Sequence, residues 1–191
     1  MTIALRIICS FALSLCIALL GQTRAANAQQ EPLIKPTEEH KLLQKDVGTW
    51  DATLTIWPME GAEPMESKGT EKNELLEGGL WLASRFEGDA GGMKFAGIGT
   101  TGYDPVEKKY VGTWVDSMTP HLMLTKGEYD KATETFTGTA EGRDSFSRQS
   151  YTAKIIAKYI GDDTRTFEMH MPGENGKHFK MMEIRYKRRA E

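Results

Sequence analysis

Polar and apolar side chains alternate with a period of two along most of the chain, as they do in β-strands that have one buried face. The positions that share a face in successive runs are Trp50, Ala52, Leu54 and Ile56; Leu80, Leu82 and Phe86; Phe95, Gly97, Gly99, Thr101 and Tyr103; Tyr110, Gly112, Trp114 and Asp116; and Tyr151, Ala153, Ile155 and Ala157. Shorter runs lie near Leu122 and Phe136, and two final strands flank Asn175-Gly176, a dipeptide typical of type I′ hairpins. About nine or ten short strands at near-regular spacing favour a barrel or sandwich over an alternating α/β fold. We expect an all-β fold, a single antiparallel up-and-down β-barrel.

One short helix is predicted before the first strand. Thr37 is a favoured N-cap residue, and Gly48 ends the helix after about two turns. Gly48-Thr49-Trp50 then opens the first strand and places Trp50 as a plug at one end of the barrel. A cation from the closing strand, Arg185 or Arg188, is expected to lie over the Trp50 indole and hold the barrel shut.

The last two strands have a predictable register. If Asn175-Gly176 forms the whole loop, the facing pairs are Phe167 with Ile184, Met169 with Met182 and Met171 with Lys180 on one face, and Glu168 with Glu183 and His170 with Met181 on the other. Two facing carboxylates repel each other when both are ionised in dry surroundings. The face with Glu168 is therefore either solvated, which we favour, or an interior functional face with a raised carboxyl pKa.

The first 28 residues have the features of a signal peptide and are excluded from the fold. Arg6 supplies a positive start, residues 7–20 are uncharged and apolar, and Ala26-Asn27-Ala28 offers a cleavage site after Ala28. The apolar run is shorter than the roughly 20 residues of a membrane span. We expect a periplasmic or secreted protein with a flexible leader at 29–36, a barrel domain at 37–191, and no membrane span after cleavage.

Composition excludes several classes of protein. Both cysteines, Cys9 and Cys16, lie in the predicted signal peptide, so the exported chain has no disulfide framework and no cysteine nucleophile. The sequence carries 24 Lys and Arg against 27 Asp and Glu, which argues against a nucleic-acid-binding protein with a clustered basic face. The sequence leaves the oligomeric state open.

Chemical motifs in the sequence are few. Gly97-Ile98-Gly99-Thr100-Thr101-Gly102 has the spacing of a dinucleotide-binding loop, but a turn and a strand follow it in place of the required helix. We interpret these glycines as positions of close backbone packing in a barrel strand. No G-x-S-x-G or H-E-x-x-H motif occurs, and no local metal constellation is formed by His40, His121, His170 and His178. We therefore expect no metal site and no required cofactor.

Aromatic residues on neighbouring strands form the candidate site. Trp81, Tyr103 and Trp114 supply ring area, while Arg85 shares a face with Trp81, and Asp116 with Trp114. Rings combined with a few placed charges are what a small-molecule pocket contains, although aromatic residues also dominate ordinary cores. We predict that these five residues line the barrel interior and bind a small, partly apolar ligand.

Three other functions remain open. An enzyme of the isomerase or cyclase type would use Asp116 or Glu168 as its base in a dry cavity, with Arg85 stabilising negative charge. A haem- or gas-binding barrel would use His121 or His170 as an axial ligand. A passive structural module would have an interior filled by Met, Phe and Leu. The sequence favours a binding protein over an enzyme.

The most distinctive segments are Gly48-Thr49-Trp50, Glu77-Gly78-Gly79, Gly102-Tyr103-Asp104-Pro105, Tyr110 to Met118, and Met171-Pro172-Gly173 with Phe179 to Glu183. Together they resemble the bacterial family called domain of unknown function 1579 (DUF1579), over about His40 to Lys187. That family is similar to the calycin barrels, the lipocalin and nitrobindin kind, which implies a closed antiparallel barrel. The resemblance implies no established activity and no catalytic residue.

Overall fold

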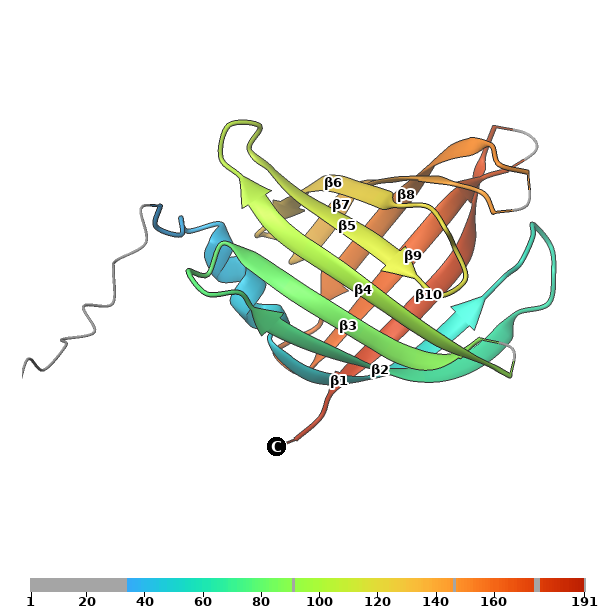
Figure 1. Ribbon diagram of the computed structural model, residues 1–191, viewed down its shortest axis with the longest axis horizontal. Coiled ribbons are helices and arrows are strands. Elements are labelled where there is room, and N and C mark those ends of the chain that lie inside the picture. Colours follow the sequence, from blue (N-terminus) through green and yellow to red (C-terminus); the bar gives the residue numbers. More distant parts are fainter. Residues whose placement is uncertain (1–33, 91, 146, 174–175, 191) are drawn as a thin grey trace, which may run out of the picture. The chain divides into compact units, whose positions relative to one another are not determined.

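The described residues form a closed barrel of ten antiparallel strands with one short helix (Figure 1). This computed structural model describes residues 34–90, 92–145, 147–173 and 176–190. The elements are the 3₁₀ helix η1 (His40–Asp46) and the strands β1 (Gly48–Ile56), β2 (Met65–Leu75), β3 (Trp81–Ala90), β4 (Met93–Asp104), β5 (Lys109–Asp116), β6 (Met123–Asp130), β7 (Thr135–Arg143), β8 (Ser150–Tyr159), β9 (Thr164–Pro172) and β10 (His178–Arg188). Each strand pairs with its neighbour in sequence, and β1 pairs with β10 to close the barrel. The predicted all-β, single up-and-down barrel is confirmed.

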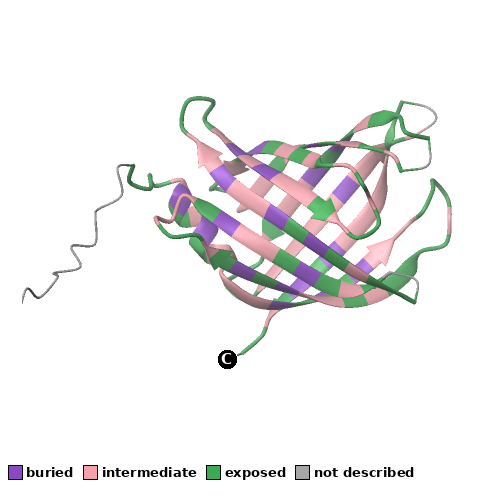
Figure 2. Ribbon diagram, viewed as in Figure 1, coloured by how far each residue is buried: buried purple, intermediate pink, exposed green. Residues whose placement is uncertain are grey.

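Side-chain burial shows which face of each strand points into the barrel (Figure 2). In β1, Trp50, Ala52 and Leu54 are buried, whereas Asp51 and Thr53 between them are exposed. Residues that face each other across two strands point to the same side, so the strand register extends this assignment around the barrel. The predicted period of two therefore separates the interior from the outer face.

The two ends of the barrel differ. At the end where β1 begins, η1 packs against β2, β3 and β4, and Leu43 is buried against Leu82 and Tyr110. The Tyr110 hydroxyl donates a hydrogen bond to the backbone carbonyl of Glu39 at 2.9 Å. We call the opposite end, where β1, β3, β5, β7 and β9 finish, the mouth; in the described part of the chain no helix covers it (Figure 1).

The helix differs from its prediction in type and at its start. It is a 3₁₀ helix preceded by Glu39, and Thr37 does not cap it, because the Thr37 hydroxyl bonds the Glu39 carboxylate at 2.7 Å. Gly48 follows the helix as predicted. Its φ of 120° favours glycine, and a Cβ there would lie 3.0 Å from a guanidinium nitrogen of Arg188.

Strand β2 has no counterpart among the predicted elements. Its inward positions are Ser67, Gly69, Glu71 and Asn73, so it lacks the alternating apolar residues by which strands are predicted. Glu71 and Asn73 are nevertheless buried, at 7% and 1% exposure. The strand therefore brings polar groups, rather than apolar ones, into the barrel.

The predicted register of the β9–β10 hairpin is confirmed for the pairs Phe167–Ile184, Met169–Met182 and Glu168–Glu183. The register then shifts at a bulge between Lys180 and Met182, so that Lys180 faces His170. The predicted pairs Met171–Lys180 and His170–Met181 are therefore wrong, because β10 carries an extra residue at Met181. Asn175 itself lies outside the described residues.

Several predictions concern residues outside the described part of the chain. They are the signal peptide at 1–28, cleavage after Ala28, and most of the leader at 29–36. Among the residues that the structure describes, no helix has the length and apolar character needed to cross a bilayer.

Candidate functional site

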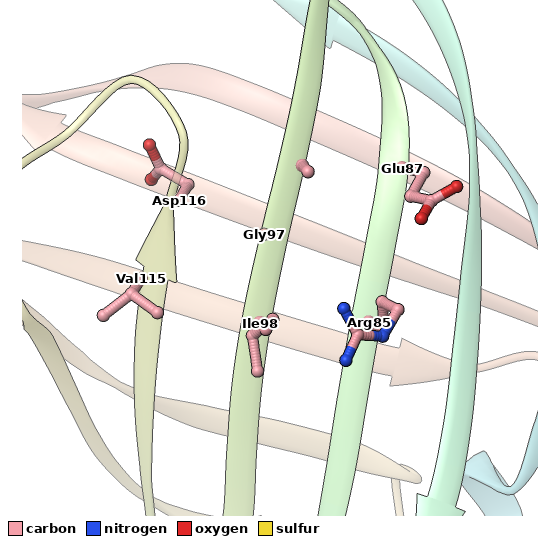
Figure 3. A pocket seen from close by; sticks show the side chains of 7 residues that line it. Arg85, Glu87, Gly97, Ile98, Val115 and Asp116 are labelled. Atoms are coloured by element: carbon pink, nitrogen blue, oxygen red, sulfur yellow. The ribbon is translucent and has the colours of Figure 1, made fainter.

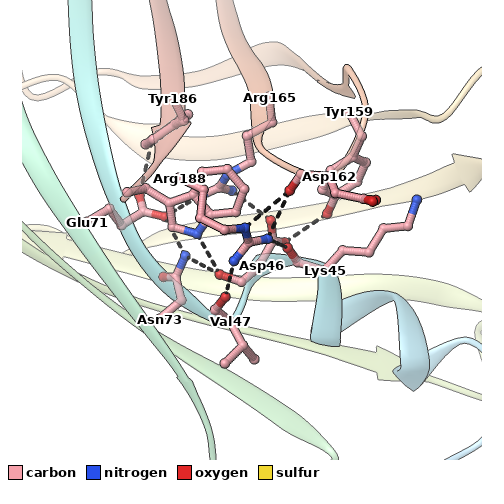
Figure 4. Close-up of polar contacts among 11 residues, drawn as sticks. Lys45, Asp46, Val47, Glu71, Asn73, Tyr159, Asp162, Arg165, Tyr186 and Arg188 are labelled. Atoms are coloured by element: carbon pink, nitrogen blue, oxygen red, sulfur yellow. Dashed lines mark hydrogen bonds and ion pairs between the residues drawn. The ribbon is translucent and has the colours of Figure 1, made fainter. Parts of the chain in front are cut away.

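A buried ionic network closes the helix end of the barrel (Figure 4). Arg165 of β9 points inward and forms ion pairs with Asp46, the last residue of η1, at 3.0 Å, and with Glu71 of β2. The exposed fraction of these three side chains is 15%, 15% and 9%, respectively. The Tyr159 hydroxyl donates to Asp46 at 2.8 Å, and the Tyr186 hydroxyl donates to Glu71 at 3.1 Å. The helix is thus tied to the inner wall of the barrel.

Two arginines pack on the Trp50 ring. The guanidinium carbon of Arg188 lies 4.1 Å from a ring centre of Trp50, and that of Arg165 lies 4.7 Å away. Arg188 also donates hydrogen bonds to two backbone carbonyls at the end of η1. The cation expected over Trp50 is therefore Arg188. Arg185 lies on the outer face, 74% exposed, because it alternates with inward-facing residues of β10.

Burial shifts the ionisation of this network. It raises the pKa of the Asp46 carboxyl, an effect that the neighbouring Arg165 cation opposes. Burial also raises the pKa of the Tyr186 hydroxyl, and the adjacent Glu71 carboxylate raises it further. The tyrosine therefore keeps the proton that it donates to Glu71. The network has the character of a structural plug, so a molecule that enters the barrel would have to use the mouth.

The inner wall of the mouth half is apolar and only half-buried. We call it the mouth wall and define it by seven of its side chains, of which Phe167, facing Ile184, lies farthest from the mouth: Phe95, Trp114, Met123, Tyr151, Phe167, Met171 and Met182. They form one continuous surface, since Phe167 and Met182 contact both of the neighbouring core clusters. Other inward side chains are buried, with Leu54 and Ile184 each 7% exposed and Met169 4% exposed. The mouth wall is thus apolar surface inside the barrel that solvent still reaches.

Trp114 is held in one orientation on this wall. A Cβ at Gly97 would come within 2.2 Å of Trp114 Cζ2, and one at Gly99 within 3.0 Å of Trp114 Cε3. These glycines therefore let the indole lie close against β4, which confirms the interpretation of the glycine motif as close packing. The indole Nε1–H donates a hydrogen bond to Asp116 Oδ2 at 3.1 Å. Trp114 consequently offers a fixed ring face.

Two polar groups adjoin the mouth wall. Asp116 Oδ1 accepts the backbone N–H groups of Met118 and Thr119, each at 2.8 Å, so its carboxylate anchors the β5–β6 loop. The Tyr151 hydroxyl contacts Met123 Sδ at 3.8 Å, and a thioether is a weak acceptor. Burial raises the pKa of Tyr151, which therefore stays a donor. Its hydroxyl can therefore donate a hydrogen bond to a stronger acceptor than the Met123 thioether.

The five residues predicted to line one pocket lie at three places. Trp114 and Asp116 lie at the mouth, as described above. Tyr103 faces inward at the helix end, where it packs in the cluster beneath η1. Trp81 and Arg85 lie on the outer face of β3, because they alternate with its buried, inward-facing residues. The structure therefore does not bring all five onto one surface.

Arg85 lines a shallow depression on the outer face (Figure 3). Arg85, Ile98 and Val115 lie in register across β3, β4 and β5, and Asp116 lies at the edge. The depression measures about 170 Å³, below the roughly 300–1,000 Å³ of typical ligand pockets. Its lining includes both residues that the enzyme hypothesis pairs, but Arg85 lies on the outer face and the Asp116 carboxylate is bound to Trp114 and the β5–β6 loop.

Glu168, the other candidate base, lies on the outer face of β9. Lys180 pairs with both Glu168, at 3.4 Å, and the facing Glu183. The Lys180 ammonium also holds the pKa of Glu183 below its ordinary value. His170 Nε2 lies 2.8 Å from Glu168 Oε2. This face is the outer one, and the lysine relieves the repulsion between the carboxylates.

The two candidate haem ligands lie in different places. His170 shares the outer face with Glu168, so its imidazole does not fit an axial position inside the barrel. His121 lies in the loop between β5 and β6, at the mouth. Among the described residues, no three His, Cys, Asp or Glu side chains are grouped so that they could hold a metal ion.

Comparison with known proteins gives a solved structure of similar fold and a matching family. In shape the chain is similar to the crystal structure of Rv2717c from M. tuberculosis, with a TM-score of 0.59 over 81% of this chain and 99% of that one. Their sequences are 11% identical, so the likeness concerns the fold alone. No curated protein sequence matches the chain. The model of the family described as "Protein of unknown function (DUF1579)" matches residues 35–188. The chain therefore belongs to the DUF1579 family.

Proposed function

We propose that the barrel binds a small, largely apolar molecule against the mouth wall. The observation that carries this proposal is the half-burial of seven inward-facing side chains, six of them apolar and the seventh Tyr151, although inward neighbours such as Leu54, Met169 and Ile184 are buried. Apolar surface left in contact with water inside a closed barrel is stabilised when a ligand covers it. Entry would be through the mouth, since η1 and the ionic network close the other end.

The mouth wall favours a neutral ligand with at least one ring and one hydrogen-bond acceptor. Phe95, Trp114 and Phe167 supply flat ring faces, and the methionines supply adaptable contacts that fit irregular shapes. The Tyr151 hydroxyl would donate to the acceptor, because its present partner is only a thioether. No uncommitted charge lines the described wall, as Asp116 is bound to Trp114 and the loop.

We propose export as the setting for this binding, on the sequence features of residues 1–28 alone. The catalytic hypothesis has less support, because Arg85 and Glu168 lie on the outer face and the Asp116 carboxylate anchors a loop. A haem-binding role would depend on His121. A Soret band that forms on haem addition and is lost in His121→Ala would favour it.

Titration with N-phenyl-1-naphthylamine, a neutral apolar fluorophore, tests the proposal. The wild-type protein is expected to give saturable fluorescence enhancement. Trp114→Ala should weaken probe binding at least about tenfold, because it removes a central aromatic contact. The matched control is Trp81→Ala, which removes the same side chain from the outer face, where it is 40% exposed, and should leave affinity unchanged.

The results of this titration distinguish ligand binding at the mouth wall from the alternatives. Equal loss of binding in both tryptophan variants would place the probe elsewhere and contradict the assignment of the mouth wall. No saturable binding by the wild-type protein would favour a passive module with a packed interior. Thermal melts check that each variant is folded, and Trp114→Phe, a smaller change, replaces Trp114→Ala if that variant unfolds.

A further inference from the structure

The methionines in the described part of the chain are confined to one half of the barrel. Nine of the ten in the sequence lie in the described residues, and all nine lie in the mouth half or in loops at the mouth. They are Met59, Met65, Met93, Met118, Met123, Met169, Met171, Met181 and Met182. The apolar cluster beneath η1 is built instead from Leu, Val, Tyr and Phe. The thioethers therefore concentrate where the proposed ligand would enter.

Seven of these methionines form two groups that differ in exposure; of the other two, Met169 is buried and Met181 is half-buried at the bulge of β10. The inner methionines, Met123, Met171 and Met182, are half-buried members of the mouth wall. The rim methionines are 65%, 50%, 61% and 40% exposed, and they are Met59, Met65, Met93 and Met118. An oxidant that approaches the mouth from solvent therefore reaches the rim methionines before the inner methionines.

We propose that the inner methionines are an oxidative modification site that switches apolar-ligand binding off. This inference rests on the proposed function of the mouth wall. Oxidation of methionine converts a flexible apolar side chain into a polar, chiral sulfoxide, and reductases can reverse it. Because three of the seven mouth-wall residues are methionines, their oxidation changes the polarity of the site itself.

The reaction is a two-electron oxygen transfer from a peroxide. A sulfur lone pair attacks one peroxide oxygen, an S–O bond forms and the O–O bond breaks. The proton of the attacked oxygen passes to the departing hydroxide, which leaves as water. Sulfur is oxidised by two electrons and the peroxide is reduced by two. The rim methionines are the more exposed group and are expected to react first, without contacting the ligand.

Tyr151 links the modification to binding. Its hydroxyl already lies 3.8 Å from Met123 Sδ, which is a weak acceptor. A sulfoxide oxygen on Met123 is a strong acceptor within reach of that hydroxyl. It would take the donor that the proposed ligand uses and add a polar group to the wall. Oxidation would thus remove both the apolar contact of the Met123 side chain and the hydrogen bond that the Tyr151 hydroxyl would donate to the ligand.

The test combines stepwise oxidation with probe binding. The full protein is treated with increasing hydrogen peroxide, sulfoxides are located by peptide mass spectrometry, and N-phenyl-1-naphthylamine is titrated at each step. Oxidation of the rim is expected to leave affinity unchanged. Oxidation of the inner methionines is expected to weaken binding at least about tenfold, because the sulfoxides place polar groups against the apolar probe and that of Met123 occupies the Tyr151 hydroxyl. Methionine sulfoxide reductases should restore binding.

Leucine variants provide the control, since Leu and Met are close in volume. The inner variant, Met123→Leu with Met171→Leu and Met182→Leu, should keep probe binding after peroxide treatment. The matched rim variant changes Met59, Met65, Met93 and Met118 to leucine, and should lose binding on peroxide treatment as the wild type does, because its inner methionines are unchanged.

Failures of the two proposals are distinguishable. If the unoxidised protein does not bind the probe, the proposed function fails. If it binds and keeps its affinity after the inner methionines are fully oxidised, only the switch is overturned. Loss of the far-ultraviolet circular dichroism of the barrel on oxidation would also overturn it, because unfolding rather than altered polarity would then explain the lost binding.

Discussion

Replacing Arg165 by methionine tests whether the plugged end depends on its buried cation. The Arg165 side chain is 15% exposed, its Nη1 lies 3.0 Å from Asp46, and it pairs with Glu71. Removing one partner of a buried ion pair costs about 3–5 kcal/mol, because the remaining charge is left without compensation. Two carboxylates lose their cation here, and the Tyr186 ring, 4.2 Å from the guanidinium carbon, loses its cation contact. We expect Arg165→Met to lower the free energy of unfolding by about 3–5 kcal/mol.

Urea unfolding followed by tryptophan fluorescence measures this loss. A domain of this size loses about 2–4 °C of melting temperature for each kcal/mol, so calorimetry should show a decrease of about 6–20 °C. Adding Glu71→Gln to Arg165→Met should recover part of the lost stability, because it removes one uncompensated charge. The double-mutant cycle then gives the coupling energy between the two side chains.

The control is Arg185→Met, the same change on the outer face of β10. Arg185 is 74% exposed and pairs with Glu183, and exposed ion pairs contribute at most about 1 kcal/mol. We expect this variant to lie within about 1 kcal/mol of the wild type. Similar small losses for both arginine variants would refute the assignment of the plugged end to an ionic network.

Three further predictions concern the hairpin, the glycine-lined wall and the junction after the helix. Lys180 keeps the pKa of Glu183 below its ordinary value. Their pairing therefore stabilises the fold fully when the pH is above the unfolded-state pKa of about 4.3. This contribution to the free energy of unfolding is lost as the pH falls through the lower folded-state pKa. Denaturation below about pH 4.3 should therefore affect the wild type more steeply than Glu183→Gln; parallel pH profiles would contradict the pairing. Gly97→Ala should cost about 1–3 kcal/mol and alter the near-ultraviolet circular dichroism, because the new Cβ would lie 2.2 Å from the Trp114 ring; an unchanged spectrum would mean that the ring is not against β4. Gly48→Ala should cost about 1–3 kcal/mol, measured by thermal unfolding, because its φ of 120° strains any other residue; a wild-type melting temperature would refute that strain.

Alternation within a strand predicts which residues share a face, but not which face is the interior. Trp81 and Arg85 share one face, and Trp114 and Asp116 share another, as predicted. The first pair lies outside the barrel and the second at the mouth, because the inward side of each strand depends on its pairing with other strands. A single five-residue pocket could therefore not be established from the sequence.

The ionic network was missed for a related reason. Asp46, Glu71 and Arg165 lie on three elements that are distant in sequence, and each alone has the appearance of a solvated charge. The spacing of Glu71 and Asn73 in a polar run with β-like alternation was the available signal, but it had no apolar residues to mark the buried side. The barrel itself was predictable because the strands other than β2 carry apolar residues at alternate positions, as β1 does with Trp50, Ala52 and Leu54.

Pairing of β1 with β10 also determines at which stage of synthesis and folding the barrel can close. Trp50 faces Arg188 across this seam, so the contact joins nearly the two ends of the domain and forms only after almost all of the chain has been synthesised. Contacts of such long range make folding slow. Until β10 arrives, β1 and β9 each present an unpaired edge, which is a template for association with other chains. Loss of the last strand should therefore produce aggregation rather than a smaller barrel.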